Sequence, residues 1–369
     1  MCSLSLEESV NYLKSKLKDA KVAECIKNLR LAYQDRNLTL YLGAGVSLGN
    51  GLPSWENLVL SMYFSGLQEQ AGDETEPPYP NYLFAIAEWH LEKRREPLDI
   101  TARKIHNLYN KRDFLRKLKH TLYAGFQRQT PDRNSLLQAN QTLNSIVRIC
   151  APQPPARAGV RSVISYNYDN LLELALNGGA KAQPVWRDNQ KIKSRAMPIY
   201  HVHGYVPIEG SGSRAEEIVF TEEQYHLVAQ NAYSWSNLVQ IQSMSTSVGL
   251  MVGLSLTDRN MRRLLDAIRK IPVQSKNYIL LQEPSWPEPE KSEMKEINKR
   301  AREYFRKFQD SGIKTEERRY QQIGTIIKQI EGRYLEEQAS ILEDMGVHAI
   351  WYKDHSEISV IIDRIIQPL

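Results

Sequence analysis

The sequence contains few cysteines: Cys2, Cys25 and Cys150 are the three among its 369 residues. Three cysteines without a C-x-x-C pair cannot form a disulfide framework, and they exclude a structural zinc site with four cysteine ligands. Long apolar runs are lacking too, because no stretch approaches the roughly 18 apolar residues of a membrane span and the first residues show no apolar signal-peptide core. We therefore expect a soluble, cytoplasmic protein that has no contact with a membrane.

A large excess of one charge is also missing. The 48 basic and 43 acidic side chains give a formal net charge of +5. One long charged run, EPEKSEMKEINKRAREYFRKFQD at 288–310, has mixed signs at helical spacing, which is more typical of a solvated helix face than of an RNA-binding patch. We expect contact with nucleic acid only indirectly, through a partner.

Short apolar segments and amphipathic segments alternate along most of the chain. A helix is predicted over about 5–34, whereas helical periodicity without a convincing strand covers about 60–150. After the punctuation APQPPARAG at 151–159, strands and helices alternate again. Strands are predicted at 37–42, 161–167, 198–204, 216–220, 247–255, 276–283 and 347–352.

This alternation predicts the α/β class, with a Rossmann-like, mostly parallel sheet covered by helices on both faces. We place an N-terminal helical segment at 1–36 and one larger domain at 37–369, with a helical insertion or cap at 60–150 inside it. Because ligands bind at the carboxyl ends of the strands in open α/β sheets, the segments that follow strands are the candidates for chemistry. Four such segments carry suitable residues.

The first segment is LTLYLGAGVSLGNGLPSW at 38–55. Gly43 and Gly45 lack the Cβ atoms that would block a diphosphate, and backbone N–H groups near a helix start can satisfy its charge. The G-x-G-x-x-G fingerprint is not matched, because Ser47 and Leu48 precede Gly49. A tight turn is therefore an equally good interpretation of this segment alone.

The second segment is SYNYDN at 165–170, where a strand gives way to a helix. Asn167 can orient a water or a sugar hydroxyl, and Asp169 places a carboxylate beside it. The alternative is structural: an Asx turn followed by a helix N-cap, with Asn170 and Glu173 as a capping pair.

The third segment is YHVHGYVP at 200–207. An imidazole at His203, at the end of a strand, can project into a cleft and act as a general base near neutral pH. His201 is two residues away, so strand alternation predicts that both rings can share one face. A histidine metal site needs a third ligand, and none lies nearby at a suitable spacing.

The fourth segment is VGLSLTDRN at 252–260, after a continuous apolar run. Gly253, Ser255 and Asp258 can hold ribose hydroxyls. A plain N-cap at Thr257 or Asp258 explains the same residues.

Taken together and in this order, from Leu38 to Leu265, the four segments resemble the motifs of the sirtuin fold family: Gly-Ala-Gly-x-Ser with a downstream G-[IL]-P, then N-x-D, His-Gly and Gly-x-Ser. The resemblance implies that NAD+ binds here. By that resemblance, the diphosphate and neighbouring ribose contact Gly43, Ala44, Gly45 and Ser47, the nicotinamide side is bordered by Pro53 and Trp55, and the adenosine side is lined by Gly253, Ser255 and Asp258. It further implies that Asn167 positions water or the nicotinamide ribose, that Asp169 faces the carboxamide, and that His203 is the catalytic base.

The sequence also departs from the protein-deacylating sirtuins. Their four-cysteine zinc module is missing, so no zinc is expected, and Ser54, Trp55 and Glu56 stand where they carry Asp-Phe-Arg. The pattern is more similar to the sirtuin-like domains of bacterial antiphage defence, which hydrolyse NAD+. The content of the chain resembles the stand-alone subunits that are paired with a HerA-type hexameric ATPase.

The resemblance therefore implies an NAD+ glycohydrolase that cleaves NAD+ to nicotinamide and ADP-ribose, depletes NAD+ in antiphage defence, forms a homo-oligomer and is controlled by assembly with a partner. Two alternatives stay open. One is an NAD-dependent protein deacylase or ADP-ribosyltransferase using the same pocket. The other is a non-catalytic subunit that binds NAD+ or ADP-ribose for assembly.

Overall fold

The centre of the fold is a seven-stranded sheet in which all neighbouring strands are parallel. The computed structural model describes residues 20–70, 97–126, 133–151, 159–176, 182–270, 276–284, 295–296, 299–300 and 316–367. In spatial order the strands are β3 (Ala182–Val185), β4 (Met197–His201), β2 (Val160–Ser165), β1 (Leu38–Leu42), β5 (Val248–Val252), β6 (Asn277–Gln282) and β7 (Val347–Tyr352). The predicted Rossmann-like parallel sheet is confirmed.

The central strand β1 shows why the sheet is covered on both faces. Its sequence LTLYL is buried at every position. Leu38, Leu40 and Leu42 belong to one apolar cluster, whereas Tyr41 belongs to a second cluster on the opposite face. Since successive side chains of a strand point to opposite faces, a strand that is apolar on both faces requires helices above and below.

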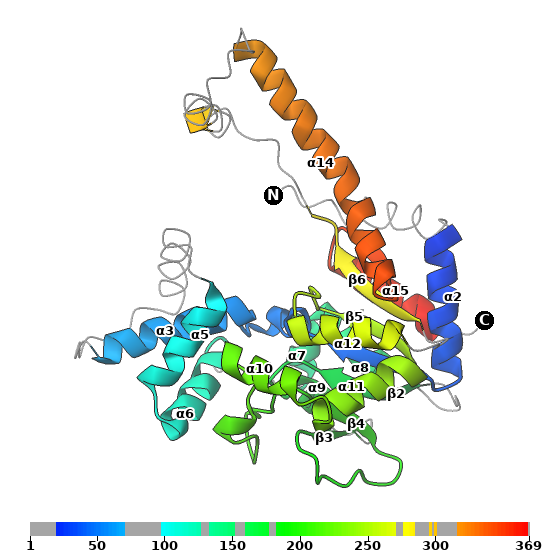
Figure 1. Ribbon diagram of the computed structural model, residues 1–369. Coiled ribbons are helices and arrows are strands. Elements are labelled where there is room, and N and C mark those ends of the chain that lie inside the picture. Colours follow the sequence, from blue (N-terminus) through cyan, green and yellow to red (C-terminus); the bar gives the residue numbers. More distant parts are fainter. Residues whose placement is uncertain are drawn as a thin grey trace.

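Two layers of helices meet this requirement (Figure 1). One layer contributes to the cluster of the β1 leucines and contains α2 (Ala20–Gln34), α8 (Gln141–Cys150), α9 (Leu171–Leu176) and α15 (Ser356–Ile366). The other contains α11 (Trp235–Thr246), α12 (Arg259–Arg269) and the C-terminal end of α14 (Glu316–Asp344). The rest of α14 extends away from the sheet.

The helical block predicted at 60–150 is observed as four further helices among the described residues, and it divides between two places. They are α3 (Trp55–Gln70), α5 (Leu98–Leu108), α6 (Lys111–Leu122) and α7 (Arg133–Ala139), followed by α8. Helices α3, α5 and α6 pack on one another, whereas α8 packs on α9 and α15 against the sheet. The end of the predicted insertion is thus part of the sheet layer and not of the cap.

Two strand predictions differ from the structure. The segment 216–220 is not a strand: a 3-10 turn, η3 (Ala215–Glu217), leads into irregular chain whose Ile218 and Phe220 are fully buried. The apolar side chains of this segment are buried in the core, but its backbone does not pair with a strand. Strand β3 was not predicted, because it is a short edge strand that contains Pro184, and proline is tolerated in sheets mainly at edges.

Helix starts follow the predicted caps. The Ser54 hydroxyl accepts the N–H of Asn57 at the start of α3, and the Gln224 side chain reaches back to the N–H of Thr221 at the start of α10 (Glu222–Gln230). Residues 5–19 of the first predicted helix and most of the charged run 288–310 lie outside the described residues. Within the described part of the chain, no helix is long and apolar enough to cross a membrane.

Candidate functional site

A cavity of about 650 Å³ opens at the carboxyl ends of β1, β2, β4 and β5. Strand β1 lies between β2 and β5, so the strand order reverses here, and ligands of doubly wound sheets bind at such a point. The volume lies within the range of small-molecule and cofactor pockets. The sides and roof come from residues at the starts of α3 and α5 and from α10, so the cap is completed by a helix that follows β4 in the sequence.

The cavity collects nearly all of the predicted site residues. Gly45 is the exception and does not line it. The predicted residues that line the cavity are Gly43, Ala44, Ser47, Pro53, Trp55, Asn167, Asp169, His203, Gly253, Ser255 and Asp258. Their roles toward a ligand remain predictions; their convergence on one cavity is a property of the fold.

The glycines of the first loop have a different role from the one expected. A Cβ at Gly43 would collide with the carbonyl oxygen of Gly253, and one at Gly45 would lie 2.8 Å from the Cα of Gly253. Gly253 itself has φ +68°, and a Cβ there would lie 2.7 Å from the backbone N of Val46. These glycines therefore let the loops after β1 and β5 pack backbone to backbone. Clearance for a diphosphate is not what requires Gly45.

The backbone of this loop offers fewer free donors than a phosphate cradle would. In the segment 43–47, the N–H of every residue except Ala44 donates to a backbone carbonyl. The close contact between the two loops uses two of these donors, since Gly43 and Gly45 donate to Val252 and Gly253. Ala44 lines the cavity, and its N–H is the one in this segment that donates to no backbone carbonyl among the described residues.

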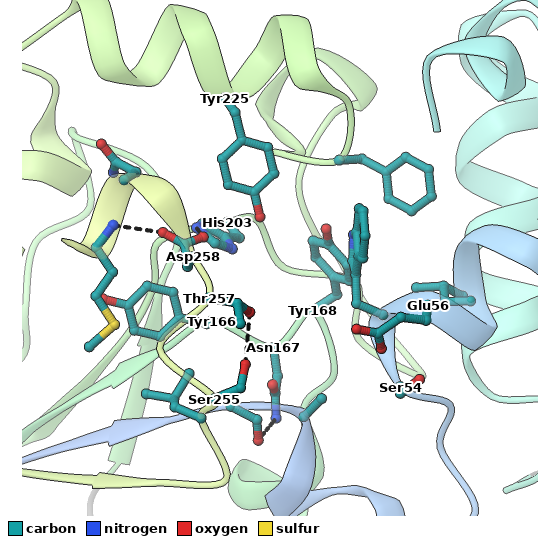
Figure 2. A pocket seen from close by; sticks show the side chains of 18 of the residues that line it. Ser54, Glu56, Tyr166, Asn167, Tyr168, His203, Tyr225, Ser255, Thr257 and Asp258 are labelled. Carbon is teal, nitrogen blue, oxygen red and sulfur yellow. Dashed lines mark hydrogen bonds and ion pairs between the residues drawn. The ribbon is translucent and has the colours of Figure 1, made fainter. Parts of the chain in front are cut away.

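Asn167 is held rigidly at the floor of the cavity (Figure 2). Its side-chain Nδ2 donates to the carbonyl of Gly43 at 3.0 Å and to Ser47 Oγ at 3.2 Å. Its backbone N–H donates to Ser165 Oγ at 3.2 Å. Because Nδ2 donates to these two acceptors, the amide group is fixed in one orientation. Its side-chain oxygen is then the atom left to bond a ligand.

Asp169 serves the structure of the site more than predicted. Its Oδ2 accepts from Ser47 Oγ at 2.9 Å, and its Oδ1 accepts from the N–H of Leu171 at 3.0 Å, which is the Asx turn considered above. Burial raises the pKa of Asp169, and the two hydrogen bonds act in the opposite direction. Through Ser47, this carboxylate fixes the Asn167 amide.

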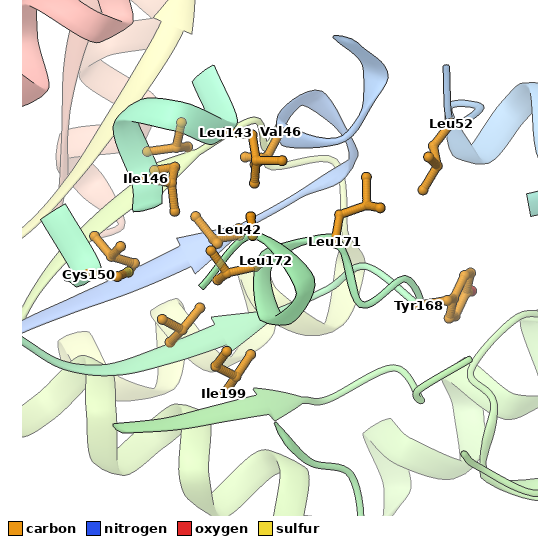
Figure 3. Close-up of a cluster of buried hydrophobic side chains, with 14 of the residues drawn as sticks. Leu42, Val46, Leu52, Leu143, Ile146, Cys150, Tyr168, Leu171, Leu172 and Ile199 are labelled. Atoms are coloured by element: carbon orange, nitrogen blue, oxygen red, sulfur yellow. The ribbon is translucent and has the colours of Figure 1, made fainter. Parts of the chain in front are cut away.

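The buried cluster beneath these residues keeps the floor in place. Val46 and Leu42 from the first loop and strand meet Leu171 and Leu172 of α9, with Leu143 of α8 above them (Figure 3). All five side chains are buried. Since interiors are close-packed, the backbone that carries Ser47 and Asp169 has little room to shift.

His203 stands at the side of the cavity with its reactive nitrogen unoccupied. The side chain is 7% exposed, and Nε2 has no hydrogen-bond partner among the described residues, although Asp258 Oδ2 lies 3.5 Å away. The rings of Tyr166 and Tyr225 flank the imidazole edge to face, at centroid distances of 5.1 and 5.4 Å. Burial lowers the pKa of His203, opposed by Asp258, so the ring is neutral at pH 7 and able to accept a proton.

His201 does not share the face of His203, contrary to the alternation argument. Strand β4 ends at His201, so the phase is lost in the turn that follows. His201 is 1% exposed and pairs with Glu173, its Nε2 lying 2.7 Å from Oε1. It does not line the cavity.

Asp258 interacts with Met261, His203 and Tyr225, and none of these contacts was predicted as its main role. Oδ1 accepts from the N–H of Met261 at 2.7 Å and so caps α12, which confirms the N-cap alternative. Oδ2 faces His203. Ser255 Oγ is paired with Thr257 Oγ1 at 2.8 Å and lies at the exposed rim.

Several residues of the cavity escaped the sequence analysis. Tyr166 and Tyr225 enclose His203 (Figure 2), and Arg259 and Arg263 come from the first turns of α12. None belongs to a recognisable spacing, and only the tertiary arrangement brings them together. In the described ranges, no group of three or more histidine, cysteine, aspartate or glutamate side chains could hold a metal ion.

A parallel α/β sheet with a cavity at the reversal of strand order places this protein in the Rossmann-like α/β class. Residues 161–307 match the model of the SIR2-like domain, so this part of the chain is similar to that domain. The resemblance to sirtuin-like proteins is confirmed. A similar protein is Defense-associated sirtuin 2 of Bacillus subtilis, which is 25% identical over 273 residues, or 72% of this chain and 23% of that protein. The chain thus spans about a quarter of the length of that relative.

Proposed function

We propose that this protein hydrolyses NAD+ to nicotinamide and ADP-ribose and that the reaction serves antiphage defence by depleting NAD+. The similarity to the SIR2-like domain supports the choice of NAD+, and the name of the Bacillus subtilis relative supports a defence role. The observation that carries the proposal is chemical: a neutral, buried His203 with a free Nε2 faces the same cavity as the immobilised amide of Asn167.

The cavity fits NAD+ by its size and by its unsatisfied polar atoms. Besides His203 Nε2, the indole Nε1 of Trp55 is buried without a hydrogen-bond partner among the described residues and lines the cavity. Buried polar groups are almost always paired, so such atoms mark places where a ligand completes the bonding. Arg259 and Arg263, beside the N-terminus of α12, and the N–H of Ala44 supply the donors that a diphosphate requires.

Hydrolysis requires modest chemistry from the protein. The bond between the ribose and the positively charged nicotinamide breaks with its electrons passing to nicotinamide, and water adds at the sugar carbon through an oxocarbenium-like state. His203 accepts the proton released by that water and passes it to solvent. Asn167 orients the ribose or the water, while the tyrosines around His203 keep the base dry.

The test incubates the purified chain with NAD+ alone and follows nicotinamide and ADP-ribose by chromatography. Both products should appear in equal amounts, and Asn167→Ala and His203→Ala should each lower kcat by about 10²-fold or more. Turnover that requires an acylated peptide would establish a deacylase, and ADP-ribose attached to protein a transferase. If NAD+ binds but is not converted, either by the chain alone or with its partner, the result would support the alternative of a non-catalytic subunit.

We further propose that the active form is a homo-oligomer and that a HerA-type ATPase encoded nearby controls it. The reaction should therefore be measured with the chain alone and with that partner co-expressed. Activity confined to the complex supports control by assembly, because a closed cap over the cavity can be shifted by a partner that binds the open form. Equal activity of chain and complex contradicts this part of the proposal.

A further inference from the structure

The buried His201 is bonded at both of its ring nitrogens. Nε2 lies 2.7 Å from Oε1 of Glu173, and Nδ1 lies 3.1 Å from the backbone carbonyl oxygen of Asn167. A carbonyl oxygen only accepts, and so does an ionised carboxylate. Both ring nitrogens must then carry hydrogen. The geometry requires an imidazolium, with one proton more than the neutral ring of His203 two residues away.

We propose that His201 is a positioning residue for Asn167, acting in its charged form as a bridge between the Asn167 carbonyl and the Glu173 carboxylate. This proposal rests on the function proposed above. Asn167 is then held from three sides: its amide by Gly43 and Ser47, its N–H by Ser165 and its carbonyl by His201. The Ser165 hydroxyl also donates to this carbonyl, at the longer distance of 3.5 Å, so His201 makes the shorter of its two contacts. His201 itself touches no ligand, because it lies outside the cavity.

The surroundings of His201 favour the charged ring. Glu173 of α9 and Asp169 of the preceding loop supply negative charge, and the ring of Tyr205 packs on the imidazole at a centroid distance of 4.5 Å. Tyr123, after α6, faces the same two carboxylates. Strand β3 has the sequence AQPV and no charged residue, and on β2 the residue paired with His201 is Ser165. The charged residue of β2, Arg161, lies four residues earlier, towards the other end of the strand.

The same groups set the direction of titration. Burial lowers the pKa of His201, but the charge and hydrogen bond of Glu173, with smaller contributions from the Asn167 carbonyl and Asp169, outweigh it and raise the pKa above the ordinary value. The extra proton resides on the ring, because imidazole is a stronger base than a carboxylate. The direction of this shift agrees with the two acceptors that face the ring nitrogens, since both favour the charged ring.

Deprotonation would release Asn167 and not Glu173. A neutral ring keeps one N–H, and the charge-assisted bond to the carboxylate is the stronger of the two. The remaining hydrogen would stay on Nε2, which leaves the lone pair of Nδ1 facing the Asn167 carbonyl. We therefore expect an alkaline limb in kcat that follows the titration of His201.

Replacing Glu173 by glutamine removes the negative charge but keeps the size and shape of the side chain. In Glu173→Gln the new amide can rotate and donate to Nε2, so a neutral His201 keeps its Nδ1–H for Asn167. This variant should hold kcat within about threefold of the wild type at pH 7 and should lack the alkaline limb. His201→Leu removes both bonds and should lower kcat by about 10- to 100-fold, with KM within about threefold, because displacement of a positioned group costs rate more than binding.

NMR of histidine-labelled and asparagine-labelled protein tests the proposal without any turnover. In the free chain, both ring nitrogens of His201 should be protonated at pH 7, with a pKa above that of a model histidine. The side-chain amide signal of Asn167 should shift with the same pKa, and this coupled shift should vanish in Glu173→Gln. His348→Gln, at a half-buried histidine of β7 whose pKa burial lowers, is the matched control and should change neither signal nor kcat.

The outcomes separate this proposal from the proposed function. A singly protonated His201 at pH 7, or an Asn167 signal that ignores its titration, overturns the bridge whatever the activity. Should His201→Leu fail to fold, the spectra of the wild type and of Glu173→Gln still decide. If NAD+ is not hydrolysed but the coupled titration is observed, the proposed function fails and the bridge stands as a positioning contact for a bound ligand.

Discussion

Replacing Asp258 by asparagine tests how the cavity sets the protonation of its base. The carboxylate lies 3.5 Å from His203 Nε2, and the two side chains are only 14% and 7% exposed. An opposite charge at such a distance moves a pKa by roughly 1–3 units, and so little solvent remains that screening is weak. Since Asp258 opposes the lowering caused by burial, its loss should lower the pKa of His203 further.

The substitution is unusually clean because the second role of Asp258 survives it. Oδ1 caps α12 by accepting the N–H of Met261, and asparagine caps helices as well as aspartate does. The folded state should therefore persist, with a change in unfolding free energy of no more than about 0.5 kcal/mol. Tyr225 also interacts with the Asp258 side chain, and an asparagine oxygen can still accept from its hydroxyl.

The assay is the pH dependence of kcat/KM for NAD+, which reports the free enzyme. His203 acts as a base only when neutral, so activity falls as pH drops through its pKa. In Asp258→Asn this acid limb should move toward lower pH. Asp266→Asn, on the exposed outer side of the same helix, is the matched control and should leave the limb in place.

Histidine NMR of the free protein gives the same quantity without turnover. A pKa of His203 that stays unchanged in Asp258→Asn would show that the carboxylate does not act on the ring. If the pKa of His203 rises in this variant, the ring must have become more exposed to water, and the buried arrangement of His203 and Asp258 described above would be refuted.

Three further predictions concern the fold. Gly253→Ala combines a left-handed backbone with a collision against Val46 and should cost about 3 kcal/mol or more of unfolding free energy, whereas Gly210→Ala, at φ +84° in open space, should cost only about 1–2 kcal/mol. Leu40→Ala, in the fully buried central strand, should cost about 2–5 kcal/mol in urea unfolding. Because the folded pKa of His201 is raised, its stabilisation is complete below about pH 6.5 and is lost as pH rises through the folded value, a fall that urea titrations should show in the wild type and less in Glu173→Gln.

The strands and most helices of this protein follow from local pattern. A continuous apolar run such as VGLMV can be satisfied only where both faces are covered, and the caps at Ser54, Thr221 and Asp258 mark helix starts by the chemistry of a few neighbouring atoms. Both requirements involve residues that are close together in the chain, so strands and helix starts can be predicted from the sequence. The pattern misled where apolar residues serve irregular chain, as at Ile218 and Phe220, and where an edge strand with a proline lacks a hydrophobic pattern.

Sequence patterns predicted only part of the site. Four segments, each behind a strand, predicted the residues that converge, because parallel strands deliver their carboxyl ends to one edge of a sheet. What each side chain does there was decided by its neighbours in space. Gly45 meets Gly253, Asp258 meets His203, and the two histidines of one short segment take opposite protonation states.

The sequence by itself thus determined the α/β class, the order of most elements and most of the predicted residues that meet at the cavity. Only the tertiary structure decided which histidine is a free base and which is a buried cation. The physical reason is that protonation depends on desolvation and on charges within a few ångströms, and at His201 and His203 those come from Glu173 and Asp258, which are distant in the chain.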